Sequence, residues 1–269
     1  MIVHDEIAGI ILAAGKSQRM GSQIPKVLHE LAGKTLIHRC LENLKGAGLQ
    51  KICLVLGSDV EPFEDFLATH KKLTICIQNH PKGTADAVAS AAFAFEGTTP
   101  ADYCSGAFHS GPKLNQKYVL IGYGDTPCIP SSLLLDFVQK SIDQDADMAL
   151  IVMDHPNPEG YGRVLLDAQG RFDRIVEEKD ANEFEKTITL CNSGVVFAKT
   201  ETLFDALVKV SNQNAQKEYY LTDTFDLAKQ SQKDVFIYKT SNFQAFNGVN
   251  TKEQLANLER WFRNQKVQS

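Results

Sequence analysis

The chain has 269 residues, of which 43% are hydrophobic and 23% are charged, and this is the composition of an ordinary folded globular protein. Its formal net charge of -5 gives no overall positive field. Composition therefore argues against a protein that binds nucleic acid or an anionic membrane surface, and any phosphate binding must be local.

Cysteine usage and the N-terminus both indicate a cytoplasmic protein. The six cysteines stand at wide spacings, without a C-x-x-C pair or a zinc-like cluster, so we expect reduced thiols. The short apolar run near the N-terminus follows His4, Asp5 and Glu6 instead of basic residues, which argues against a signal peptide. No apolar stretch is long enough to span a bilayer. The sequence leaves the oligomeric state open.

Strand and helix signals alternate through the first half of the chain. This alternation predicts an α/β fold, in which a Rossmann-like, mixed but mostly parallel sheet is flanked by helices. The predicted strands are Ile7 to Ala13, Lys51 to Leu56 and Leu73 to Gln78. The predicted helices between them are Thr35 to Ala47, which stops at the C-cap glycine Gly48, and Val60 to His70.

The stretch from Ile10 to Leu28, IILAAGKSQRMGSQIPKVL, joins a buried strand to a basic loop. Backbone N–H groups in such a loop can bind an anion, and cationic side chains further on can hold the outer phosphates of a nucleotide. We therefore predict a phosphate site here. Taken in isolation, loop cations such as Arg19 and Lys26 are also compatible with plain solvated side chains.

The next two strand ends carry further candidate ligands. The third strand runs into NHPKGT and then into an alanine-rich helix, Ala85 to Phe95, at the sheet edge where open α/β sheets bind ligands. Residues Glu96 to Lys117 lose periodicity and predict a surface loop. The following strand, Tyr118 to Ile121, ends in GYGDTP. Its Asp125 is placed either to hold a divalent cation or simply to begin a turn.

The second half of the chain predicts an α+β elaboration on the same sheet. A glycine within the strand from Thr187 to Phe197 indicates a bulge or a close approach of backbone to ligand, and Thr251 with Gln254 has the spacing of a capping box. The other predicted elements are a helix from Ser131 to Gln144, a strand from Met148 to Met153, a hairpin of Arg163 to Leu166 with Phe172 to Glu177, helices from Glu201 to Val210 and Thr222 to Gln230, a strand from Val235 to Lys239, and a last helix from about Thr251 to about Asn264.

Two glycine-rich nucleotide motifs fail on the opening stretch. A P-loop, G-x-x-x-x-G-K-[ST], could end at Gly15-Lys16-Ser17, but it requires glycine where the chain has Ile10. A dinucleotide fingerprint, G-x-G-x-x-G, fails because Ser17 takes the middle position and Met20 the last. The phosphate site therefore belongs to another class.

The segment LAAGKSQRMGSQIPK resembles the signature of the sugar-nucleotide pyrophosphorylases, L-A-A-G-x-G-T-R-M followed by P-K. Similar motifs follow in the same order along nearly the whole chain: QNHPKGTADA, YGDTP, GYGRV, IVEEKDA, NSGV, NAQKEYYLTD and GVN. Together they resemble the uridylyltransferase half of the bacterial bifunctional N-acetylglucosamine-1-phosphate enzymes. The chain departs from that pattern at Ser17 and Gln18, which replace Gly and Thr, and in the segment from Glu96 to Lys117, which is longer than usual and is expected to cover the site or an interface.

The resemblance implies a role for each motif. Arg19 and Lys26 would bind the triphosphate and act as the catalytic cations, and Asp125 with Asn250 would coordinate Mg²⁺. The residues that would bind the nucleotide are Leu12, Ala13, Ala14 and Gly15 through backbone, Gln78, Gly83 and Thr84 at the uracil, and Tyr123 and Gly124 at the ribose. Those that would bind the sugar are Gly162, Glu177, Asn192, Tyr220 and Thr222. Read alone, Glu177 is compatible with a solvated turn and Tyr220 with the core.

The implied reaction forms UDP-N-acetylglucosamine and pyrophosphate from UTP and N-acetylglucosamine-1-phosphate. Such an in-line attack needs positioning and charge neutralisation more than covalent catalysis, which suits two cations and Mg²⁺. The alternatives are transfer to another hexose-1-phosphate, or a weakly active nucleotide-sugar-binding protein. We expect one nucleotidylyltransferase domain over 1–269, with 1–146 mainly on the nucleotide side and 147–269 mainly on the sugar side, and no β-helix acetyltransferase domain.

Overall fold

Strand β1 (Ile7–Ala13) lies inside the sheet and is buried along its whole length. It pairs in parallel with β4 (Lys51–Gly57) on one side and β7 (Tyr118–Tyr123) on the other. β5 (Thr74–Gln78) continues the parallel sheet beyond β4. Because helices cover both faces of these strands, their sequences are continuous apolar runs and do not alternate. The structure, a computed structural model, describes residues 4–15 and 18–268.

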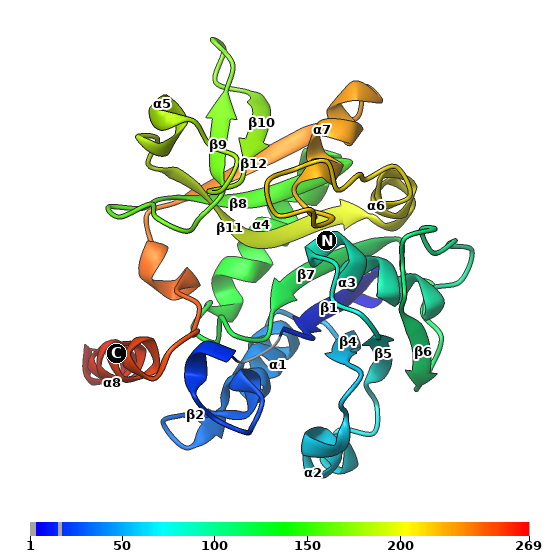
Figure 1. The fold of residues 1–269 in the computed structure, drawn as a ribbon, viewed down its shortest axis with the longest axis vertical. Coiled ribbons are helices and arrows are strands. Elements are labelled where there is room, and N and C mark those ends of the chain that lie inside the picture. The colour runs from blue at the N-terminus through cyan, green and yellow to red at the C-terminus, as the bar shows by residue number, and fades with distance from the viewer. Residues whose placement is uncertain (1–3, 16–17, 269) are drawn as a thin grey trace.

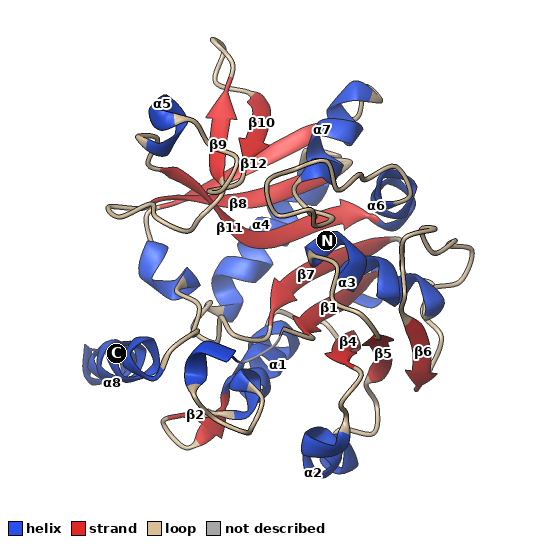
Figure 2. Ribbon diagram, in the orientation of Figure 1, coloured by secondary structure: helices blue, strands red, loops and turns tan. Residues whose placement is uncertain are grey.

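Among the described residues, ten strands form one sheet, which continues from the first half of the chain into the second (Figure 2). β11 (Leu190–Lys199) joins the two parts, because it pairs antiparallel with β7 and with β8 (Met148–Asp154). The other strands are β6 (Ala107–Ser110), β9 (Arg163–Leu166), β10 (Phe172–Val176) and β12 (Val235–Thr240). β6, β10 and β11 run opposite to the rest, so the predicted mixed and mostly parallel sheet is confirmed.

Helices cover both faces of this sheet (Figure 1). Residues of α1 (Leu36–Gly46) and α4 (Ser131–Asp143) pack with Ile7 and Ile11 on one face. Residues of α3 (Thr84–Ser90), α6 (Thr200–Leu207) and α7 (Asp223–Gln230) pack with Ile10 and Leu12 on the other. The remaining helices are α2 (Glu64–Thr69), α5 (Glu183–Lys186) and α8 (Lys252–Gln268), and a two-stranded hairpin is formed by β2 (Glu30–Leu31) and β3 (Lys34–Thr35).

Two predicted ends of helices are confirmed in atomic detail. Gly48 follows α1 with φ of +93°, the left-handed conformation that ends many helices. At the start of α8, Gln254 N donates to Thr251 Oγ1 and Thr251 N donates to Gln254 Oε1, both at 3.1 Å. This reciprocal pair is the predicted capping box.

Two predictions about chain segments are wrong. The expected loop from Glu96 to Lys117 contains β6, which pairs antiparallel with β5 at the edge of the sheet. An edge strand is held by backbone hydrogen bonds, so its sequence AFHS needs no apolar run. The strand expected from Thr187 begins only at Leu190, because the capping box of Asn182 and Glu185 first forms α5.

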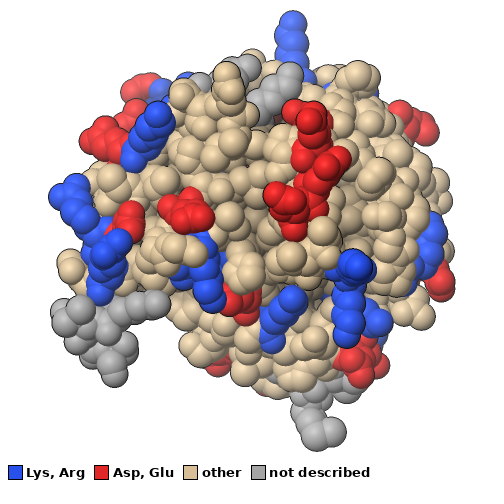
Figure 3. Space-filling model, turned by 90° about the horizontal axis from the view of Figure 1, so that it is seen from below, with Lys and Arg blue, Asp and Glu red and all other residues tan. Residues whose placement is uncertain are grey.

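The surface carries charged side chains of both signs, as expected for a chain with a small net charge of -5 (Figure 3). On the face shown in Figure 3, Lys and Arg side chains are interspersed with Asp and Glu. Among the described residues, no helix is both long enough and apolar enough to cross a membrane.

Phe197 is the aromatic centre of one core layer. It is fully buried, stacks on Tyr118 with ring centroids 5.2 Å apart, and meets the edge of Phe137 at 6.3 Å. We predict that Phe197→Ala lowers the free energy of unfolding by about 3–5 kcal/mol, because it removes buried area and leaves a cavity. Urea denaturation measures this loss. Phe184→Ala is the matched control, since Phe184 is 74% exposed and its truncation should leave the unfolding midpoint unchanged.

Candidate functional site

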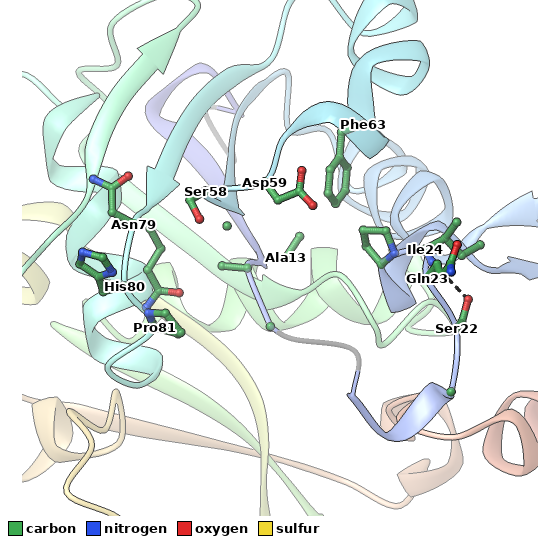
Figure 4. Close-up of a pocket in the computed structure, with 16 residues that line it drawn as sticks. Ala13, Ser22, Gln23, Ile24, Ser58, Asp59, Phe63, Asn79, His80 and Pro81 are labelled. Atoms are coloured by element: carbon green, nitrogen blue, oxygen red, sulfur yellow. Dashed lines mark hydrogen bonds between the residues drawn. The ribbon is translucent and has the colours of Figure 1, made fainter.

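The carboxyl ends of β1, β4 and β5 open onto a pocket of about 770 Å³ (Figure 4). We call it the base pocket because it is lined by Gln78, which the resemblance implies would contact the base. In an open α/β sheet this edge binds ligands, because neighbouring strands end there and their loops diverge. Asn79, His80 and Pro81 lie on one side of the pocket, and Gln23, Ile24 and Phe63 lie on the other (Figure 4). The described residues that line it are Ala13, Ala14, Gly15, Gly21, Ser22, Gln23, Ile24, Pro25, Gly57, Ser58, Asp59, Phe63, Gln78, Asn79, His80 and Pro81.

A second pocket of about 700 Å³ is lined by most of the other predicted site residues. We call it the sugar pocket because the residues that the resemblance implies would bind the sugar line it. Its walls come from segments far apart in the sequence: the end of β7, the loop before β9, the end of β10, β11, and the segments before α7 and α8. The predicted residues that line it are Arg19, Thr84, Tyr123, Asp125, Gly162, Glu177, Asn192, Tyr220, Thr222 and Asn250.

Four predicted residues line neither pocket: Leu12, Lys26, Gly83 and Gly124. Gly124 and Leu12 are joined by a hydrogen bond from Gly124 N to Leu12 O of 2.9 Å, next to residues that line the sugar and base pockets respectively. Gly83 has φ of +122°, and a Cβ on it would lie 2.4 Å from the carbonyl oxygen of Tyr219. Its glycine is therefore required for packing against the backbone of Tyr219. Lys16 and Ser17 lie outside the described residues, so the structure does not address the replacement of the family's glycine by Ser17.

The wall between the two pockets is held together by the backbone of residues 219–221. Tyr219 N donates to Lys82 O at 2.8 Å, and Ala85 N donates to Tyr219 O at 2.9 Å. Leu221 N donates to the hydroxyl of Thr84 at 2.9 Å. Thr84 therefore has a structural hydrogen bond as well as a place in the lining of the sugar pocket.

Glu177 provides a carboxylate in the sugar pocket. Its Oε1 accepts a hydrogen bond of 2.8 Å from the hydroxyl of Thr222. Burial raises the pKa of this carboxyl above its ordinary value, and the bond from Thr222 opposes that shift. Gly162 lies beside it, since a Cβ on Gly162 would be 3.3 Å from Glu177 Oε2. Glu177 does begin a turn, since its carbonyl oxygen accepts from Asp180 N at 2.9 Å, but its side chain is half-buried and hydrogen-bonded instead of solvated.

Asn192 lies where β11 is irregular. The pairing register between β11 and β8 shifts between Asn192 and Val196, and this is the bulge that the glycine predicted. Asn192 Oδ1 accepts from Gly194 N at 3.0 Å, and Asn192 N donates to Gly162 O at 2.8 Å. A Cβ on Gly194 would meet the ring of Tyr123 at 2.3 Å. The bulge therefore gives Tyr123 its place beside β11.

One lysine joins the residues predicted to bind metal. Lys26 Nζ forms an ion pair with Asp125 and donates to Asn250 Oδ1 at 2.8 Å. The segments around the two oxygens are tied by a further bond, from Val249 N to Asp125 O at 3.0 Å. Residues 26, 125 and 250 thus meet at one point, although nearly the whole chain separates the first from the last.

The two oxygen atoms at this point, from Asp125 and Asn250, are of the type that binds a magnesium ion. A carboxylate oxygen and an amide oxygen already contact the same positive group, so both are close enough to share a cation. Mg²⁺ prefers oxygen ligands and keeps several waters, so it needs few protein groups. Among residues 4–15 and 18–268, no group of three or more His, Cys, Asp or Glu side chains forms another candidate metal site.

Sequence reasoning missed several carboxylates around the sugar pocket. The Tyr220 hydroxyl donates to Asp180 Oδ2 at 3.2 Å. Tyr220 is therefore a buried residue with a polar partner, and it also lines the sugar pocket. Burial and the neighbouring Asp226, Glu177 and Asp180 raise the pKa of Asp223 to about 6. Burial raises that of Asp226 to about 6 also. The IVEEKDA and LTD motifs contained two of the missed carboxylates, Asp180 and Asp223, but their convergence depends on how β10 and α7 pack.

Asp226 gives a pH-dependent prediction. Its pKa is higher in the folded than in the unfolded protein, so the folded state loses stability as pH rises from about 4 to about 6. Asn cannot ionise, and we predict that Asp226→Asn unfolds at a higher temperature than the parent protein at pH 7.5 but not at pH 4.5. Thermal unfolding at both pH values tests this.

The exposed Asp205→Asn serves as the matched control for this experiment, with no pH-dependent difference from the parent protein expected. A change in melting temperature for Asp226→Asn that is the same at both pH values would contradict the assignment.

The sequence is similar to known proteins over nearly its full length. The MobA-like NTP transferase domain matches residues 9–187. The bifunctional protein GlmU of Syntrophomonas wolfei is 34% identical over 263 residues, which cover 97% of this chain and 54% of that protein. The bifunctional protein GlmU of Staphylococcus carnosus is 35% identical over 257 residues, which cover 94% of this chain and 52% of that protein. The chain thus spans about half the length of these relatives.

The fold is shared with a solved structure as well. A UDP-glucose pyrophosphorylase complexed with UDP-glucose superposes with a TM-score of 0.74, over 96% of this chain and 98% of that one. Its sequence identity is 16%, so this likeness concerns the fold alone.

Proposed function

Because this chain belongs to the MobA-like NTP transferase family, we propose that it is a sugar-1-phosphate nucleotidylyltransferase that makes UDP-N-acetylglucosamine and pyrophosphate from UTP and N-acetylglucosamine-1-phosphate. The observation that carries the proposal is the meeting of Lys26, Asp125 and Asn250 beside a pocket lined by Glu177, Asn192 and Thr222. The substrates and the residue roles given below are part of the proposal.

The reaction needs charge neutralisation at a defined place. An oxygen of the sugar phosphate attacks the α-phosphorus of UTP, the bond from that phosphorus to the bridging oxygen breaks, and pyrophosphate leaves with the electron pair. Arg19 and Lys26 would bind the phosphates and stabilise the negative charge that grows on the leaving group. No covalent nucleophile is required, so catalysis would rest on positioning and charge neutralisation, to which these cations would contribute.

Asp125 and Asn250 would hold Mg²⁺. When bound, this ion would supply positive charge to the phosphate oxygens. Lys26 would then exchange its contacts with Asp125 and Asn250 for contacts with the triphosphate, because two cations at the same pair of oxygens repel each other.

The two pockets would divide the substrates between them. The backbone of residues 12–15 would line the nucleotide, with residues 13–15 in the base pocket, and Gln78 would read the base there. Tyr123 and Gly124 would lie at the ribose. In the sugar pocket, Glu177 would accept hydrogen bonds from the sugar, and Asn192 would accept or donate them, at its hydroxyl and N-acetyl groups. Thr222 would orient Glu177, and Gly162 and Tyr220 would complete the wall. Because β7 pairs with both β1 and β11, we propose that both halves act as one domain.

An assay of pyrophosphate release tests the proposed substrates. A panel should combine UTP, CTP, dTTP, ATP and GTP with the 1-phosphates of N-acetylglucosamine, glucose and galactose, each with and without Mg²⁺. We expect release to require Mg²⁺ and to be fastest with UTP and N-acetylglucosamine-1-phosphate. Preference for another hexose would correct the sugar assignment, and no turnover with any pair would refute the proposed activity.

Asp125 gives the sharpest mutational test of the metal assignment. We predict that Asp125→Ala lowers kcat by about 10²-fold or more, since a bound ion contributes several kcal/mol of charge stabilisation at the transition state. Circular dichroism and thermal unfolding should show a folded protein. The matched control is Asp154→Ala, an exposed aspartate at the carboxyl end of β8, which should keep its activity. An Asp125→Ala variant with parental kcat would show that Asp125 is not a metal ligand.

A further inference from the structure

The side-chain amide of Gln78 is held in one orientation by two acceptors. Its Nε2 donates to Asp86 Oδ2 at 2.6 Å and to the carbonyl oxygen of Gly83 at 3.2 Å. A carbonyl oxygen can only accept, and a carboxylate can only accept, so the NH₂ group must face them and the oxygen must face away. Oε1 accepts no hydrogen bond from the described residues, and Gln78 lines the base pocket.

Asp86 is itself fixed by the surrounding chain. It is 0% exposed, in the first turn of α3. Its Oδ2 also accepts from Lys82 N at 3.3 Å, and its Oδ1 accepts from Ser105 N at 3.4 Å. Both carboxylate oxygens therefore receive donors, and neither can turn away from Gln78 without losing a bond in a buried place.

The donor at Ser105 comes from the segment before β6, which is fastened along the loop after β5. Asn79 Nδ2 donates to Ser105 O at 2.6 Å, and the Ser105 hydroxyl donates to His80 O at 3.2 Å. Lys82 Nζ donates to Tyr103 O at 2.7 Å, and the Tyr103 ring stacks on Tyr219 with centroids 3.8 Å apart. The segment 103–106 thus holds Asp86 and the loop 79–82 as one unit.

We propose that Asp86 is a positioning residue that sets the choice of pyrimidine by making Gln78 present an oxygen, and only an oxygen, to the base. This inference rests on the proposed function, in which Gln78 reads the base. Uracil and thymine carry a hydrogen-bond donor at N3, which Oε1 can accept. Cytosine carries a lone pair at N3, so a fixed acceptor there rejects it. Without Asp86, only the longer bond of 3.2 Å to Gly83 O would oppose a turn of the Gln78 amide, so cytosine would be rejected less strongly.

Asp86→Asn tests the proposal with nearly unchanged shape. The new amide can donate as well as accept, so it allows Gln78 to turn its NH₂ group toward the base. We expect kcat/KM for UTP divided by kcat/KM for CTP to fall by about tenfold or more. The ratio of UTP to dTTP should stay as in the parent protein, because both bases carry N–H at position 3. General damage to the fold would instead lower all three values together.

Three other variants complete the experiment. Asp86→Thr also places a group that can donate or accept beside Gln78, and it should lower the UTP to CTP ratio if Asp86→Asn does not fold. Gln78→Met, which cannot hydrogen-bond, should bring that ratio close to one. Asp102→Asn makes the same chemical change at an exposed aspartate of the segment before β6, so it is the matched control and should keep the parental ratio.

The outcomes separate this inference from the proposed function. No turnover by the parent protein with any substrate pair would refute the proposed function itself. Turnover with a preference for UTP that Asp86→Asn and Asp86→Thr both retain would overturn the role of Asp86 alone. A parent protein that prefers CTP, or a Gln78→Met variant with the parental ratio, would show that Gln78 does not read position 3 of the base.

Discussion

The contact of Lys26 with Asp125 and Asn250 joins three distant segments of the chain at the candidate site. Lys26 comes from the loop after β1, Asp125 from the turn after β7, and Asn250 from the segment that enters α8. A carboxylate in a partly buried place needs a cation or several donors, so each of these segments is held by the others. Under the proposed function, the same need would favour a metal ion at this point, and a triphosphate would compete for Lys26.

The wall between the pockets shows a second constraint, which is one of space. Gly83 lies against the backbone of Tyr219 so closely that no side chain fits between them. Two backbone hydrogen bonds cross this contact, and the hydroxyl of Thr84 adds a third. The loop beside the base pocket and the segment beside the sugar pocket therefore share one boundary. If one segment moved, the other would have to move with it or lose these hydrogen bonds.

The sequence predicted the parts of the fold that follow from local pattern. The strands of the first half were evident because buried parallel strands are continuous apolar runs, and the capping box of Thr251 and Gln254 was evident from spacing alone. β6 was not evident, since an edge strand needs no apolar face. The start of β11 was misplaced because a short capped helix precedes it.

The site was predicted only as far as motif order allowed. The motifs that include Glu177, Asn192 and Thr222 lie far apart in the chain, and no spacing rule brings them into one pocket; the resemblance did so, and the structure shows them together. Asp86 was not singled out, because an aspartate in an alanine-rich helix looks like an ordinary first-turn residue. Its role depends on a hydrogen bond to Gln78, eight positions earlier, that arises only when the loop folds back.

The stacking of Tyr103 on Tyr219, with the bonds of Ser105 to the neighbouring loop, bears on how this protein could be re-engineered. A designer who wished to change nucleotide preference would naturally transplant the loop 79–82 from a relative. In this chain that loop is hydrogen-bonded to residues 103–106, and a transplanted loop would have to fit these unchanged partners. The smallest unit that could be exchanged is therefore discontinuous: it comprises the loop 79–82, the segment 103–106 and the first turn of α3.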